Sequence, residues 1–149
     1  MKTFSSPQRG FSLIELLIVV AIIGIIAAIA IPYLVAARQA SNSASAIASL
    51  RVIHQGQNSY RTTTGLYGTV ADLSNASYLT DPDLTTSGVK SHYQFTITPD
   101  STDPGSDYTA EAVPIDPPVS IWFHYFINAT GVIRRNQGAR ATAGSNPID

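Results

Sequence analysis

The stretch RGFSLIELLIVVAIIGIIAAIAIP, residues 9–32, decides the fold of this chain. From Leu16 to Ile31 every residue is apolar or glycine, and the low-charge run continues to Ala37 before Arg38 ends it. At about 1.5 Å per residue, a helix of this length crosses a bilayer. The sequence therefore predicts a membrane-spanning helix over residues 11–37.

One carboxylate, Glu15, lies near the start of this apolar run. A charged group in hydrocarbon costs about 2.5 to 3.5 kcal/mol on insertion scales, so an acid at this position indicates a role. One interpretation places Glu15 at the level of the headgroups, where its side chain reaches water. The other pairs it with a cation of another molecule, which offsets much of the cost of burying it. Spacing alone does not separate the two.

Three kinds of N-terminal segment begin with basic residues such as Lys2 and Arg9 before an apolar run. A secretory signal peptide would offer Ala28 and Ala30 for cleavage, but its apolar region is about 7 to 15 residues long and carries no charge. An uncleaved anchor, oriented by its cytoplasmic positive charges, does not explain why a carboxylate stands at Glu15. The third kind is a segment cut near the carboxylate itself.

The residues Gly10, Phe11 and Glu15 stand in GFSLIE, which closely resembles the processing motif of type IV prepilins and type II secretion pseudopilins. The resemblance implies that a membrane peptidase cuts between Gly10 and Phe11 and that Phe11 is then N-methylated. Residues 1–10 would be a leader peptide. The resemblance also favours the pairing role for Glu15, with the amine of Phe11 on the same or a neighbouring subunit as the partner.

Helix-forming sequence continues beyond the apolar run and has no proline over residues 34–60. We expect one helix from about residue 11 to about residue 60, ended near Gly65. Pro32 removes a hydrogen bond within it, so with Gly24 it predicts a bend or a local loss of helix. The resemblance implies that this loss occurs on assembly. In the second half of this helix, five residues at spacings of three and four share one face: Ala46, Leu50, Ile53, Gln57 and Tyr60.

The sequence after this helix changes to strand-like alternation. A connecting region with a helical turn over Val70–Leu73 comes first. We then expect three or four antiparallel strands, with the helix over residues 40–60 covering one face, which is an α+β fold. The last two strands, joined by NATG, are typical of a hairpin. Strands are predicted over residues 93–98, 107–113, 120–128 and 132–136.

The order of a long helix followed by antiparallel strands resembles the pilin fold, most specifically over residues 9–53. Segments farther on, such as SGVKSHYQFTITP, resemble the group that includes the major pseudopilin of type II secretion. The expected domains are a leader over 1–10, a hydrophobic helix over 11–37 and a globular domain over 38–149. Many major pilins close a C-terminal loop with a cysteine pair, but this chain has no cysteine. We therefore expect its tail, ARATAGSNPID, to be loosely held or bound to neighbours.

No catalytic motif occurs, so we do not expect an enzyme. The three histidines, His54, His92 and His124, lie in no zinc-protease spacing. A net charge of −1 without a basic stripe argues against direct nucleic-acid binding.

Three carboxylates, Asp100, Asp103 and Asp107, stand within PDSTDPGSD and are weak calcium candidates. Type II major pseudopilins carry calcium in a loop near the C-terminus, but this spacing is not that of an EF-hand. A solvated turn is the other interpretation, and no further cofactor is expected.

These features predict a structural subunit. The resemblance implies a single-pass inner-membrane prepilin that is cut by prepilin peptidase and polymerises with copies of itself, on an inner-membrane assembly platform and with minor pilins as further partners. The product would be an extracellular type IV pilus or pilus-like filament, serving adhesion, motility, DNA uptake or secretion. Two alternatives stay open. One is a major-type pseudopilin of a periplasmic type II pseudopilus, and the other is a secreted binding protein with a signal peptide.

Overall fold

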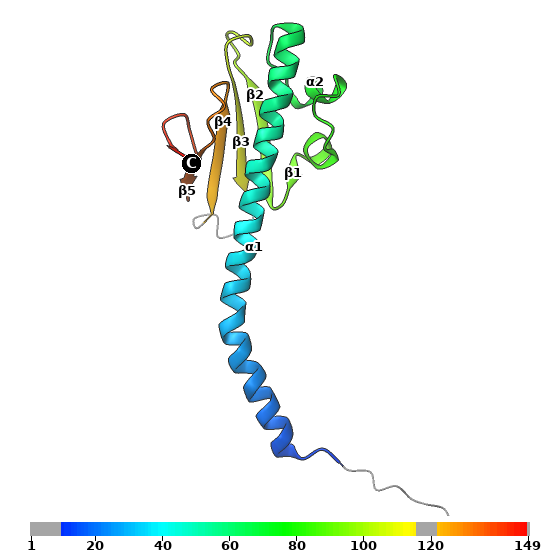
Figure 1. Cartoon of the computed structure of the whole chain (residues 1–149), viewed down its shortest axis with the longest axis vertical. Helices are drawn as coiled ribbons and strands as arrows, with labels where there is room; N and C mark the ends of the chain where they lie inside the picture. Colours follow the sequence, from blue (N-terminus) through cyan, green and yellow to red (C-terminus); the bar gives the residue numbers. More distant parts are fainter. Residues whose placement is uncertain (1–9, 116–121, 149) are drawn as a thin grey trace, which may run out of the picture. The chain divides into compact units, whose positions relative to one another are not determined.

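The computed structural model of the chain describes residues 10–115 and 122–148 (Figure 1). The chain divides into two compact units between Arg38 and Gln39, beside the boundary expected at residues 37 and 38. Of the expected leader, only Gly10 lies within the described residues.

Helix α1 (Leu13–Thr64) contributes to both units and confirms the single long helix expected from the sequence. It ends at Gly65, whose φ of 81° is the left-handed conformation that commonly terminates helices. The helix continues without interruption through Gly24 and Pro32, so a single chain shows no break at either residue. The loss of helix expected there concerns the assembled state and stays a prediction.

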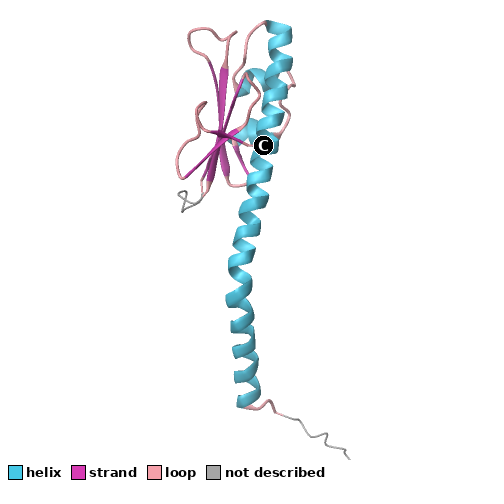
Figure 2. Cartoon of the chain, turned by 60° about the vertical axis from the view of Figure 1, so that its left-hand side comes forward, coloured by secondary structure: helices cyan, strands magenta, loops and turns pink. Residues whose placement is uncertain are grey.

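The buried face of α1 in the second unit is the stripe that the sequence predicted. Ala46, Leu50, Ile53 and Gln57 are all 0 to 1% exposed. Gly56 lies on this face too, and a Cβ there would come within 2.9 Å of the backbone oxygen of Tyr78. Helix and connecting chain therefore touch at Gly56, which explains why no larger residue stands there. Figure 2 shows this part of α1 lying along one side of the sheet.

The connection from α1 to the sheet contains two short helical segments. Helix α2 (Val70–Asn75) is the predicted turn, and Thr69 and Asp72 form a reciprocal capping box at its start. The π-helical segment η1 (Asp83–Ser87) was not predicted. The connection is attached to α1 by Gln57, whose buried side chain accepts from the backbone N–H of Gly68 at 2.9 Å and donates to its carbonyl at 2.7 Å.

The sheet confirms the antiparallel architecture and extends it. Its strands pair in chain order, each antiparallel to the next. The four predicted strands are present, although Ser120 and Ile121 of the third lie outside the described residues. Two further strands of two residues each stand at the edges. The six are β1 (Val89–Lys90), β2 (Tyr93–Pro99), β3 (Tyr108–Pro114), β4 (Phe123–Asn128), β5 (Arg134–Gln137) and β6 (Asn146–Pro147).

The core lies between α1 and one face of this sheet. On that face β3 contributes Ala110 and Ala112, both 0% exposed, so the helix approaches the central strand closely. Large side chains from β2 and β4 pack on either side of these alanines: Tyr93, Phe95, Tyr125 and Ile127.

The C-terminal tail is not loosely held, so that alternative was wrong, whereas binding to neighbours stays a prediction. Its strand β6 pairs with β5, and the N–H of Ile148 donates to the carbonyl of Ile133 at 2.9 Å. Arg134 also donates to the carbonyl of Ser145 at 2.9 Å, and Ala141 is 2% exposed. Backbone pairing and one guanidinium therefore hold the tail without a disulfide.

Candidate processing and assembly site

The predicted processing residues lie directly before α1. Gly10, Phe11 and Ser12 are outside any helix or strand and exposed to solvent. Phe11 is 79% exposed, and a Cβ on Gly10 would meet no atom within 4 Å among the described residues. The peptide bond that joins Gly10 to Phe11 therefore lies between two exposed residues, outside any helix or strand.

Glu15 is placed by a helix-capping hydrogen bond. Ser12 precedes the first helical residue, and its backbone N–H donates to Oε2 of Glu15 at 2.9 Å. This is one half of a capping box, in which an acid at the third helical position satisfies the free N–H of the cap residue. The positive end of the helix dipole also favours a negative charge in this first turn. In the single chain, the carboxylate is therefore already hydrogen-bonded to its own helix.

The role of Ser12 is one that the sequence argument missed. The signal was visible, because Ser12 and Glu15 form the S-x-x-E pattern that often begins a helix before an apolar run. A helix start leaves its first backbone N–H groups unpaired, and Glu15 satisfies that of Ser12 in addition to any role between subunits.

The first half of α1 presents an uncovered apolar surface. From Phe11 to Val35 the large apolar side chains are 45 to 81% exposed. The most apolar 18-residue window of α1 has a mean hydropathy of 3.1, none of it is buried, and the helix is long enough to cross a membrane. Gly24 lies within this surface, with nothing within 4 Å of its Cβ position among the described residues. Such a surface needs lipid or other helices around it.

Two of the three aspartates proposed as calcium candidates, Asp100 and Asp103, accept hydrogen bonds within their own turn. Oδ1 of Asp100 accepts from the backbone N–H groups of Thr102 at 2.7 Å and Asp103 at 3.0 Å, and these bonds lower the pKa of Asp100. Oδ1 of Asp103 accepts from Gly105 N–H at 3.1 Å. These bonds shape the loop between β2 and β3.

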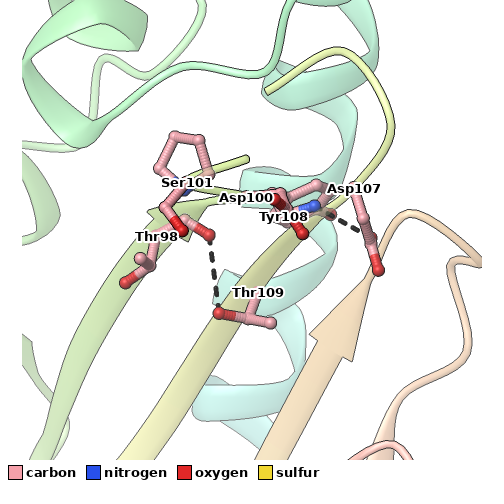
Figure 3. Close-up of a pocket in the computed structure, with 7 residues that line it drawn as sticks. Thr98, Asp100, Ser101, Asp107, Tyr108 and Thr109 are labelled. Carbon is pink, nitrogen blue, oxygen red and sulfur yellow. Dashed lines mark hydrogen bonds between the residues drawn. The ribbon is translucent and has the colours of Figure 1, made fainter. Parts of the chain in front are cut away.

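Asp107 is directed elsewhere, toward the end of β4. Its carboxylate accepts from the backbone N–H of Ala129 at 2.9 Å and from the side chain of Asn128 at 3.2 Å. In the described part of the chain, no three His, Cys, Asp or Glu side chains gather as a metal ion would require. An open pocket of about 230 Å³ lies beside the loop (Figure 3). Its lining residues are Thr98, Pro99, Asp100, Ser101, Asp107, Tyr108 and Thr109.

The three histidines lie on different elements and form no common site. His54, on α1, is hydrogen-bonded through Nδ1 to the hydroxyl of Tyr108 at 2.7 Å and through Nε2 to Asn58 at 3.0 Å, and partial burial lowers its pKa. His92 is exposed, before β2. His124 is buried on β4.

Comparison with known proteins agrees with the position of the predicted site. A family model described as a prokaryotic N-terminal methylation motif matches residues 5–31. The type IV major pilin protein PilA of Myxococcus xanthus is 47% identical over 57 residues, which are 38% of this chain and 26% of that protein. The type IV wide pilus major component PilA4 of Thermus thermophilus is 46% identical over 59 residues, which are 40% of this chain and 45% of that protein. No solved structure matches the chain.

The matches cover less than half of either relative, so they concern one part of each protein. The antiparallel sheet after the long helix supplies independent support over the rest of the chain. The methylation motif, the similarity to two type IV major pilins and this α+β fold together support a type IV pilin family for the chain.

Proposed function

We propose that this chain is a prepilin, a structural subunit without catalytic activity, that polymerises into a type IV pilus. The observation that carries the proposal is the methylation motif over residues 5–31, placed where an accessible peptide enters a long apolar helix. Prepilin peptidase would cut between Gly10 and Phe11, and Phe11 would be N-methylated. Gly10 and Phe11 thus act as the processing residues.

Assembly would exchange one partner of Glu15 for another. In the single chain the carboxylate accepts a neutral backbone N–H from Ser12. Cleavage creates a cationic amine on Phe11, and hydrogen bonds between charged groups are about twice as strong as neutral ones. In the apolar filament core, a carboxylate paired with the amine of a neighbouring subunit is better satisfied than one that caps its own helix. Glu15 would therefore set the stagger of one subunit against the next.

The first half of α1 would supply the packing surface between subunits. Because this surface leaves lipid rather than water, its association would be driven by van der Waals packing between helices and by the pairing of Glu15, with little hydrophobic gain. Contacts between different faces of identical subunits do not close into a ring unless the rotation is exact, so a fibre grows. Before assembly, the same surface would hold the subunit in the inner membrane as a single pass, in reach of the assembly platform and minor pilins. In the filament, α1 would lose helical structure at Gly24 and Pro32.

The pilus is favoured over the type II pseudopilus because both relatives are named as pilus components. A secreted binding protein is disfavoured because its signal peptide would not need GFSLIE. To distinguish the first two, cells producing this subunit are imaged for long surface fibres. Long fibres support the pilus, and fibres confined to the envelope support the pseudopilus.

Mass spectrometry of the N-terminal peptide of the mature chain tests the proposal directly. The expected first residue is N-methylated Phe11. A Gly10→Val variant places a branched side chain beside the cut and is expected to remain unprocessed. Gly24→Ala is the matched control, because its Cβ meets nothing within 4 Å among the described residues. A mature chain that begins after Ala30 would refute the proposal.

A further inference from the structure

A buried histidine lies on the face of the sheet that α1 does not cover. Tyr125 and Ile127 of β4 point toward α1, so the alternate residues His124 and Phe126 point to the opposite, outer face. Both are nevertheless only 6% exposed. Neither ring nitrogen of His124 has a hydrogen-bond partner among the described residues. Such a group is unusual, because buried polar atoms are nearly always paired.

Near His124 on this face is the segment Gly138–Ser145, which we call the strap, because the charge of its Arg140 acts on the imidazole and is paired with Glu111 of β3. The strap turns back beside β4 and β5 (Figure 1). Its first residue donates from N–H to the carbonyl of Trp122 at 3.1 Å, and its last accepts from Arg134 at 2.9 Å. Between these ends, Ala141 is buried.

One ion pair fastens the middle of the strap to the sheet. Nη1 of Arg140 donates to Oε2 of Glu111, on β3, at 3.1 Å. Asn136, which stands opposite His124 on β5, donates from Nδ2 to the carbonyl of Arg140 at 3.4 Å. The strap is therefore attached to the strands on both sides of His124.

The charges that face His124 come from these same elements. Arg140 on the strap opposes protonation of the imidazole, and Glu111 on β3 favours it. On β5 the residue opposite His124 is neutral, and Arg134, on the same outer face, is engaged with the carbonyl of Ser145. Arg135 lies on the other face, over the ring of Phe123. In the described part of the chain, Glu111 is the one carboxylate that acts on His124, and it already holds Arg140.

We propose that Gly138–Ser145 is an acid-released strap, and that protonation of His124 beneath it weakens the Arg140–Glu111 pair and opens the outer face. A protonated imidazole repels Arg140 directly. If Glu111 turns to the imidazolium instead, Arg140 loses its partner. Both responses detach the same point of the strap.

The sign of the pH effect depends on whether His124 binds a proton more tightly when the strap is open or when it is closed. Burial, and then the charge of Arg140, lower the pKa of His124 from its ordinary 6.5, against the smaller effect of Glu111. With the strap open, His124 meets water and regains its ordinary pKa, so the open state binds more protons. The closed strap is fully favoured above pH 6.5 and loses stability as the pH falls toward the lower pKa of the closed state.

Hydrogen–deuterium exchange on the full chain in detergent micelles tests the proposal. At about pH 5.5 and about pH 7.5 the carboxylates stay ionised while histidine changes charge. After correction for intrinsic rates, we expect backbone amides of the strap to exchange about tenfold faster at the lower pH, with β2 and β3 unchanged. His124→Phe removes the titrating group and should exchange equally at both pH values.

Two variants separate this response from general acid sensitivity. His92→Asn removes an exposed histidine at a φ of 64°, which asparagine tolerates, and should keep the pH response. Arg140→Gln removes the ion pair and the charge that repels the imidazolium, so the strap should exchange somewhat faster than wild type at pH of about 7.5 and respond less to acid. Fluorescence of Trp122, the single tryptophan, reports whether each variant is folded. If His124→Phe does not fold, His124→Gln replaces it. An unchanged pH response without His124, or no response in the wild type, would overturn the proposal.

Discussion

The hydrogen bonds from Gln57 to Gly68 predict a measurable loss of stability when this side chain is replaced. Gln57 is 0% exposed and satisfies both backbone groups of Gly68, which is itself buried. In Gln57→Leu both groups lose their partner, at about 1 to 3 kcal/mol each. The additional apolar burial of leucine returns about 1.5 to 3 kcal/mol. The expected net loss in the free energy of unfolding is therefore about 2 kcal/mol.

For a folded unit of this size, such a loss lowers Tm by about 8 °C. Thermal unfolding in detergent, followed by the fluorescence of Trp122, measures it. Gln55→Leu is the matched control, because Gln55 is exposed on the same helix, and should change stability by no more than about 0.5 kcal/mol. If the two variants unfold at the same temperature, the hydrogen bonds to Gly68 do not hold the connection to α1.

A second variant tests the donor half of the same interaction. Gln57→Glu keeps an acceptor for the N–H of Gly68, but an ionised carboxylate has no proton to donate to the Gly68 carbonyl. Burial raises the pKa of such a glutamate above its ordinary value, so the variant should be stabilised below pH of about 4.3 and lose that contribution as the pH rises through the raised pKa. Unfolding midpoints that fall on acidification, relative to wild type, would contradict this assignment.

Three other substitutions test separate parts of the molecule. Glu15→Gln should be processed normally, since the cut lies before α1, but should give fewer filaments. N-terminal mass spectrometry measures processing and filament yield measures assembly. A normal filament yield would contradict the pairing role of Glu15. Gly56→Ala should destabilise the fold by about 1 to 3 kcal/mol in chemical denaturation, because its Cβ would lie 2.9 Å from a backbone oxygen. Gly24→Ala is the control and should not destabilise the fold, because no described atom lies within 4 Å of its Cβ position. The hydrogen bond from Lys90 lowers the pKa of Asp81, so Lys90→Met should raise that pKa. Above the ordinary pKa of a carboxyl group, the variant should therefore be less stable than wild type. NMR titration of Asp81 measures the pKa, and an unchanged value would contradict this prediction.

The long helix and the main strands could be predicted because each leaves a periodic signal over many residues. The apolar run and the stripe that includes Leu50 and Ile53 predicted α1, and alternation predicted β2 and β3. Strands β1 and β6 have two residues each, which is too short for alternation to be visible. The π-helical segment η1 gave no periodic signal either, because it spans only five residues.

The processing and assembly residues could be proposed from the sequence because they form a motif that resembles a family, and their roles stay predictions, whereas features that depend on packing were missed. Gly10, Phe11 and Glu15 form a sequence motif, and the family match over residues 5–31 agrees with it. The burial of His124 could not be predicted, because aromatic residues occupy both faces of β4 and the strap near it belongs to a tail expected to be loose. Cysteine content was a poor guide to that tail, since its pairing with β5 requires only backbone groups.

The order of the strands also bears on how the chain folds as it is made. From β2 to β6, each strand pairs with the one that precedes it in the sequence, so every strand pairing closes over a short span of chain. The buried stripe of α1 is synthesised first but reaches its partners on β3 and β4 only after those strands exist. Until then these side chains are open to water and to chaperones. A chain that ends before β4 would therefore keep the stripe of α1 but lack Tyr125, Ile127 and Ile133, which complete its cover.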